Sequence, residues 1–238
     1  MGSRSFPATR WTLIVRAGQQ GSPAADGALA ELCAAYWYPV YAFVRRMGHS
    51  SDESLDLTQE FFARFLEKRP FTQADPAKGR FRSFLLTCAK RFLADQADRR
   101  RAAKRGAPVV PLDSEDAEQR YSRRLMNEQT PERLFEREWA LTLIARVNQN
   151  VREAFAREGR ADYFDRLKQF LPGDTESLPY SDLAVQLGTT EGALKVAVHR
   201  LRRRYREMFR TEISRLVSEP DQVDDEVRHL LAILRTES

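Results

Sequence analysis

Arginine and lysine are the residues in this sequence whose clustering indicates a specific chemistry. Residues 195–210 hold seven Lys/Arg against one acid, and residues 76–106 hold ten against two. Cations gathered in two separate blocks favour binding to the phosphates of a nucleic acid. The alternative interpretation is two well-solvated helix faces. Residues 219–226 carry five acids and no base.

No pattern typical of catalysis or of cofactor binding accompanies these cations. His49, His199 and His229 are far apart, and no metal-binding carboxylate cluster, phosphate-binding glycine loop or nucleophile–base pair is visible. Cys33 and Cys88 lack the spacing of a zinc site or a disulfide framework, which indicates core thiols in a reducing compartment. We therefore expect a cytoplasmic protein with no enzymatic activity, no metal, no cofactor and no membrane-inserted segment.

Helical periodicity dominates the chain and predicts the elements that position the cations. We expect an all-α fold of two helical domains joined by an acidic linker, the second containing a helix-turn-helix. The expected parts are a short N-terminal helix within residues 1–24, a first domain at 25–106, a linker at 107–129, a second domain at 130–217 and an acidic C-terminal helix at 218–238.

The stretch YSDLAVQLGTTEGALKVAVHRLRRRY carries the helix-turn-helix pattern. Leu183 and Leu187 are spaced to face inward from a short helix, and Leu194 and Leu201 from a longer one. Gly188 between them permits a tight turn. The second helix of such a unit lies in the DNA major groove, so the outward arginines would meet phosphates. A plain charged hairpin fits the same pattern.

Two helices of the first domain combine a capping signal, a polar face and an aromatic, basic stretch. Residues 50–53, Ser-Ser-Asp-Glu, form an N-terminal capping signal for the helix that contains DLTQEFFARFL. The later helix, GRFRSFLLTCAKRFLADQADRRR, alternates Phe with Arg, as surfaces that accept unstacked bases do. The alternative is that Phe81 and Phe84 are ordinary core residues.

Three of these stretches, in this order, resemble the bacterial RNA polymerase sigma factors of the extracytoplasmic-function (ECF) group. DLTQEFFARFL is similar to the segment that docks on core polymerase. GRFRSFLLTCAKRFLADQADRRR is similar to the segment that opens and reads the minus-10 element, and YSDLAVQLGTTEGALKVAVHRLRRR to the segment that reads the minus-35 element. The resemblance covers roughly residues 25–210.

The resemblance implies a role for each group of residues. The core-polymerase-binding residues would be Asp56, Gln59, Glu60 and Arg64. The minus-10 residues would be Phe71, Arg80, Phe81, Arg82, Lys90, Arg91 and Arg99. The minus-35 residues would be Thr190, Glu191, Lys195, Val196, His199, Arg200, Arg202 and Arg203. The implied partners are core RNA polymerase, promoter DNA and an inhibitory protein such as an anti-sigma factor, with a free chain that is a monomer.

Several departures from the family pattern bear on DNA recognition. Arg91 replaces the usual Asn of the minus-10 segment, and Val196-Ala197 replaces Ser-Arg in the minus-35 helix, where Val196 could contact a thymine methyl. The section at 147–179 is longer than usual. The acidic tail after Pro220 is extra, and it either packs as an additional helix or covers the basic recognition helix as a built-in restraint.

Three functions compete at this point. A sigma factor explains the polar face, the Phe/Arg helix and the helix-turn-helix together. A helix-turn-helix regulator that is not a polymerase subunit explains only the last of these, and a stable dimer would favour it. A nucleic-acid enzyme would need reactive groups that the sequence does not display.

Overall fold

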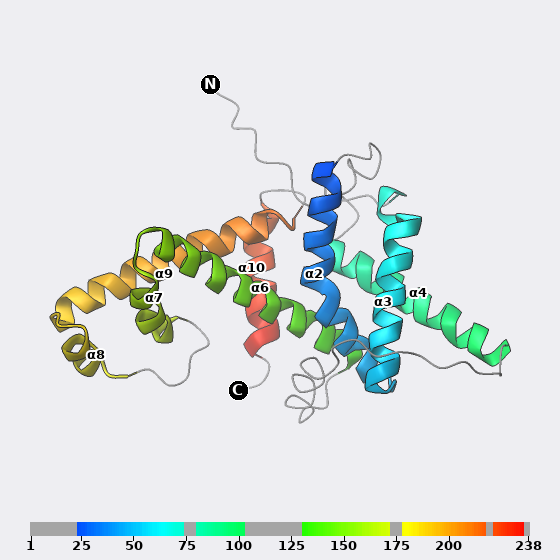
Figure 1. Ribbon diagram of the computed structural model, residues 1–238, viewed down its shortest axis with the longest axis horizontal. Coiled ribbons are helices and arrows are strands. Elements are labelled where there is room, and N and C mark those ends of the chain that lie inside the picture. The colour runs from blue at the N-terminus through cyan, green and yellow to red at the C-terminus, as the bar shows by residue number, and fades with distance from the viewer. Residues whose placement is uncertain (1–22, 74–79, 103–129, 172–177, 218–220, 236–238) are drawn as a thin grey trace, which may run out of the picture. The chain divides into compact units, whose positions relative to one another are not determined.

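The structure is a computed structural model that describes residues 23–73, 80–102, 130–171, 178–217 and 221–235. All regular elements in these ranges are helical, which confirms the all-α class (Figure 1). The expected helix within residues 1–24 and the linker at 107–129 fall almost entirely outside the described residues. None of the described helices is long and apolar enough to cross a membrane.

Eight α-helices and two short 3-10 helices make up the described parts of the chain (Figure 1). The α-helices are α2 (Pro23–Arg46), α3 (Ser51–Lys68), α4 (Phe81–Ala102), α6 (Pro131–Arg157), α7 (Ala161–Leu167), α8 (Tyr180–Gln186), α9 (Glu191–Ser214) and α10 (Gln222–Arg235). The 3-10 helices are η1 (Pro70–Gln73) and η3 (Lys168–Phe170).

Compactness divides the chain into two units. The first unit contains Met1–Thr142 and Ser214–Ser238, and the second contains Leu143–Ile213. The division falls inside α6, and α10 belongs to the first unit together with α2, α3 and α4. Compactness alone does not assign function, so the domain boundaries expected from the sequence stay a prediction.

Helix α3 begins where the sequence signal places it. The Ser50 hydroxyl accepts a hydrogen bond from the Glu53 amide at 3.3 Å, and the Glu53 carboxylate accepts one from the Ser50 amide at 3.4 Å. This capping box satisfies two amides that the helix itself leaves unpaired, and such a cap stabilises a helix by about 1 kcal/mol. The helix ends at Arg69, whose φ of 45° is left-handed and whose amide donates to the Phe65 carbonyl at 3.1 Å.

Aromatic rings form much of the core of the first unit. The Phe65 ring centroid lies 5.4 Å from that of Phe71 and 6.4 Å from that of Phe81. The Tyr36 ring meets Phe81 edge-on at 5.4 Å and stacks with Trp139 at 6.2 Å. The beginning of α6 is therefore packed on the same core as α2 and α4.

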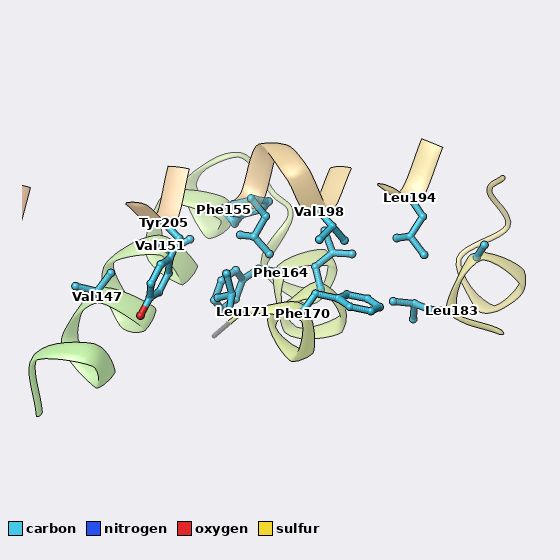
Figure 2. Packing of buried hydrophobic residues seen from close by; sticks show 13 residues of the cluster. Val147, Val151, Phe155, Phe164, Phe170, Leu171, Leu183, Leu194, Val198 and Tyr205 are labelled. Carbon is cyan, nitrogen blue, oxygen red and sulfur yellow. The ribbon is translucent and has the colours of Figure 1, made fainter. Parts of the chain in front are cut away.

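The second unit has a separate core, built from the last turns of α6 with α7, η3, α8 and α9. Figure 2 shows its side chains, with Leu183 of α8 and Leu194 of α9 together at one end and Val147 of α6 at the other. The inward positions Leu183, Ala184, Leu194, Val198 and Leu201 are buried as the helical periodicity predicts, and Leu187 is partly buried against them.

The turn between α8 and α9 depends on a single glycine. Gly188 has a φ of +62°, which L-residues with a Cβ atom rarely adopt. The Thr189 amide donates to the Ala184 carbonyl at 3.0 Å, which closes the end of α8. The Thr190 hydroxyl then accepts from the Ala193 amide at 3.2 Å and caps the start of α9. This turn fixes where the exposed face of α9 begins.

Candidate functional site

The polar face of α3 gathers the four residues predicted to dock on polymerase. Gln59 is exposed and Asp56, Glu60 and Arg64 are half-exposed, while the opposite face of the helix is buried. Glu60 and Arg64 form an ion pair one turn apart, and the Arg64 guanidinium lies 5.4 Å from the centre of the Phe92 ring. The ring and the ion pair hold Arg64 in place, so the face is presented by a rigid helix.

The seven residues predicted for the minus-10 element do not share one environment. Lys90, Arg91 and Arg99 are exposed on α4, and Arg80 is half-exposed just before it. Phe71, Phe81 and Arg82 are buried, with relative exposures of 1%, 2% and 3%. Phe81 is therefore a core residue in this structure, as the alternative interpretation held. Phe84 is half-buried beside it, at a ring distance of 6.3 Å.

Acidic side chains from distant parts of the chain pair with three of these cations. The Glu226 carboxylate of α10 pairs with the Arg82 guanidinium, and its other oxygen lies 2.8 Å from Arg80 Nε. On α6, Glu132 Oε1 lies 2.6 Å from Lys90 Nζ, and this hydrogen bond lowers the pKa of Glu132. Glu136 Oε1 lies 3.8 Å from Arg82 Nε.

Arg82 also contacts an aromatic ring. Its guanidinium carbon lies 4.6 Å from the centre of the Trp139 ring on α6. A cation over a desolvated indole is attracted to the ring quadrupole, by about 2 kcal/mol or more. The arginine therefore has two kinds of partner inside the first unit, an aromatic face and a carboxylate. No periodicity in the sequence connects residue 82 to residues 139 and 226.

All eight residues predicted for the minus-35 element are exposed around the first turns of α9. Lys195 Nζ lies 2.6 Å from Glu191 Oε1, and the hydrogen bond that Lys195 donates to Glu191 is the main reason that the pKa of Lys195 is raised. Val196 is 51% exposed, so its side chain is accessible to a partner. The structure thus brings these residues onto one accessible surface.

Two of these residues have structural tasks as well. Arg202 Nε donates to the Phe170 carbonyl at 2.9 Å and so ties α9 to η3. The Thr190 hydroxyl caps α9. Substituting either would therefore change the second unit itself, whereas Arg203, at 67% side-chain exposure, is better suited to test DNA contacts alone.

Sequence reasoning missed a cation–aromatic cluster in the second unit, in a hollow that Arg200 and Arg203 also line. The Arg204 guanidinium lies 5.0 Å from the centre of the Phe155 ring and 2.8 Å from a Glu158 oxygen, and the Arg160 guanidinium lies 4.7 Å from the centre of the Tyr163 ring. These side chains line a hollow of about 370 Å³. More than 40 residues of sequence separate Arg204 from the other four, so helical spacing gives no signal for this cluster.

The two thiols are not reactive groups in this structure. Cys33 and Cys88 are free and partly buried. Burial raises the pKa of Cys33 to about 11, and burial is also the main cause of the raised pKa of Cys88. A thiol with a raised pKa stays protonated and is a poor nucleophile.

One comparison with known proteins gives a match for part of the first unit. Residues 34–103 match the family model for Sigma-70 region 2. No curated protein and no solved structure matches the chain. The matched segment contains the polar face of α3 and all of α4, so these helices form a region 2 domain, a module of the transcription machinery.

A Sigma-70 region 2 domain implies that the chain acts as a sigma factor. It is a non-enzymatic subunit that binds core RNA polymerase and directs it to promoters. This confirms the sigma-factor interpretation over the helix-turn-helix regulator that is not a polymerase subunit, and over the nucleic-acid enzyme.

Proposed function

We propose that the chain is an alternative sigma factor of the ECF group, which binds promoters through two separate helical surfaces. The region 2 match carries this proposal, because it covers the α3 and α4 surfaces and leaves residues 104–238 to supply the second. In support, three segments similar to the family occur in the family order. We place the first domain at 25–106 and the second at 130–217, as expected from the sequence.

The polar face of α3 is proposed to bind core polymerase. It combines Asp56, Gln59 and Glu60 within little more than one helical turn, and Arg64 one turn further. A rigid helix with its opposite side in the core loses little conformational entropy on docking, which favours affinity.

Helices α8 and α9 are proposed to act as a helix-turn-helix on the minus-35 element. In support, Lys195, Val196 and His199 are exposed near the start of α9, where a recognition helix contacts base edges. The exposed Arg200 and Arg203 follow within about one turn and suit backbone phosphates. The exposed Val196 suits a thymine methyl.

On α4, the exposed Arg91 and Arg99 are proposed to contact the minus-10 region first. Arg80, Arg82 and Lys90 would join them only after release from their acidic partners. We further propose a cytoplasmic protein that is monomeric when free. An anti-sigma factor or other inhibitory protein is the expected additional partner.

The test is assembly with core RNA polymerase followed by transcription from a promoter library. The wild-type chain should co-elute with core enzyme and produce promoter-dependent transcripts that reveal both recognition elements. Glu60→Lys with Gln59→Ala should abolish co-elution while the circular dichroism spectrum stays unchanged. Glu67→Lys, the same charge reversal two turns further along α3, is the matched control.

Each result has a distinct meaning. Unchanged affinity of the double variant would refute the assignment of the α3 face. Equal losses in the double variant and in Glu67→Lys would show a general charge effect rather than a local contact. Duplex binding without polymerase association would refute the proposed function itself.

A further inference from the structure

The C-terminal helix α10 places a carboxylate on the arginines that were assigned to promoter DNA. Glu226 pairs with both Arg82 and Arg80, 144 residues away from Arg82 in sequence. With Glu132 on Lys90, three cations of the minus-10 set have acidic partners. The sequence left two alternatives for the acidic tail, which could pack as an additional helix or cover the recognition helix. In the structure, the partners of Glu226 lie on and just before α4.

The Glu226 contact is buried. The Glu226 side chain is 1% exposed and that of Arg82 is 4% exposed. Val223 and Leu230 are buried on the same face of α10, one turn to either side of Glu226. A buried carboxylate is costly unless a cation compensates it, so the position of α10 depends on the arginine pair.

The buried cluster is incompletely satisfied, which makes the contact displaceable. Among the described residues, Arg82 Nε, His229 Nε2 and Glu226 Oε2 are buried atoms without a hydrogen-bond partner, although Glu226 Oε2 lies 2.8 Å from Arg80 Nε in an ion pair. The two carboxylate oxygens of Glu136 lie 3.8 Å from Arg82 Nε and 3.6 Å from His229 Nε2, beyond hydrogen-bond distance. A partly satisfied buried polar network stabilises less than a complete one, so a better anion can compete for the arginines.

A phosphate is such an anion. Guanidinium groups bind carboxylates and phosphates with the same planar donor geometry, and a nucleic-acid backbone offers several phosphates in a row. Lys90, Arg91 and Arg99 lie on the same helix, so a bound backbone would gain contacts that Glu226 cannot provide.

We propose that α10 is an internal competitor of promoter DNA, whose Glu226 carboxylate occupies the phosphate-binding position on Arg80 and Arg82 and must leave before the minus-10 region binds. The free chain is then closed, and the holoenzyme on a promoter is open. This inference rests on the proposed minus-10 role of α4. It concerns control of that surface, not its identity.

The size of the effect follows from the population of the open form. If α10 is open in roughly one molecule in ten, the apparent affinity of the free chain for DNA is about tenfold weaker than the intrinsic affinity. Glu226→Gln removes the charge but keeps the size and shape of the side chain. It should therefore tighten DNA binding by up to about tenfold. Asp225→Asn, on the neighbouring exposed position that pairs with Arg228 in its own helix, is the matched control and should change little.

The experiment uses the full-length chain with and without core polymerase. The probe is a labelled fork-junction DNA that carries the minus-10 strand of a promoter transcribed by the holoenzyme. Affinity is measured for the wild type, Glu226→Gln and Asp225→Asn. Hydrogen exchange of the amides at 222–235 is followed in the wild-type chain before and after saturation with this DNA.

Tighter binding by Glu226→Gln alone, with faster exchange in α10 of the wild type when DNA is added, supports the inference. Equal or weaker binding by a folded Glu226→Gln chain overturns it. If that variant does not fold, hydrogen exchange of the wild-type chain is the deciding measurement. In that case, α10 amides that stay protected at saturating DNA overturn the inference. A wild-type holoenzyme that transcribes normally while both measurements fail would leave the proposed function intact. A wild-type chain that neither joins polymerase nor transcribes would refute both.

Discussion

Replacing Gly188 with alanine tests how the turn between α8 and α9 determines the second unit. A Cβ atom at Gly188 would meet nothing within 4 Å, so the effect is purely conformational. At a φ of +62°, an L-residue costs roughly 1–2 kcal/mol. The reduced freedom of the unfolded chain returns about 0.4–1 kcal/mol. We therefore expect Gly188→Ala to lower the free energy of unfolding of the second unit by about 1 kcal/mol.

Gly192→Ala is the matched control, four residues further along the chain. A Cβ atom there also meets nothing within 4 Å, but Gly192 lies inside α9, where alanine is favoured over glycine by up to about 1 kcal/mol. The same chemical change should thus stabilise at Gly192 and destabilise at Gly188. Gly188→Asn should cost less than Gly188→Ala, because asparagine tolerates the left-handed region better.

The assay is urea unfolding of the full chain followed by circular dichroism, with hydrogen exchange of the α8 and α9 amides to assign the change to the second unit. Gly188→Ala should also weaken binding to a minus-35 duplex, since the turn fixes the start of α9. The argument from backbone conformation would be refuted if Gly188→Ala left the free energy of unfolding unchanged or raised it. It would also be refuted if the alanine substitutions at Gly188 and Gly192 shifted that free energy in the same direction.

Two further predictions concern charged side chains. Arg203→Ala should lower the slope of log affinity against log salt for a minus-35 duplex by roughly 0.9, the loss of one phosphate contact, whereas a loss confined to certain sequences would indicate base reading. Burial is the main cause of the lowered pKa of His229, and the positive charges of Arg82 and Arg80 lower it further. The carboxylates of Glu136 and Glu226 oppose this shift but do not cancel it. The unfolded chain therefore binds the proton more readily, so the stability from His229 is fully present above about pH 6.5 and is lost as pH falls through the folded pKa. His229→Gln should flatten the fall in melting temperature between about pH 8 and pH 5, and identical pH profiles for the two chains would contradict this.

Local signals in the sequence were sufficient to predict the helices and the exposed faces of α3 and α9. The Ser50–Glu53 capping box and the Gly188 turn depend on residues within one or two turns of each other, so their chemistry can be read from spacing. The exposed faces of α3 and α9 follow from helical periodicity, because a helix with one apolar face must present the other to solvent.

Whether each arginine on or next to α4 is buried or exposed, and which acid it pairs with, depended on tertiary structure. Periodicity places Phe81 inward, but no local pattern reveals that Arg82 is buried beside Trp139 and Glu226. A cation can enter a core only where a carboxylate and a ring from elsewhere in the chain converge on it. The sequence by itself determined that the chain is helical and carries two basic blocks and an acidic tail. Only the packing of α6 and α10 in the first unit decided which of those charges meet, because that choice depends on contacts up to 144 residues apart.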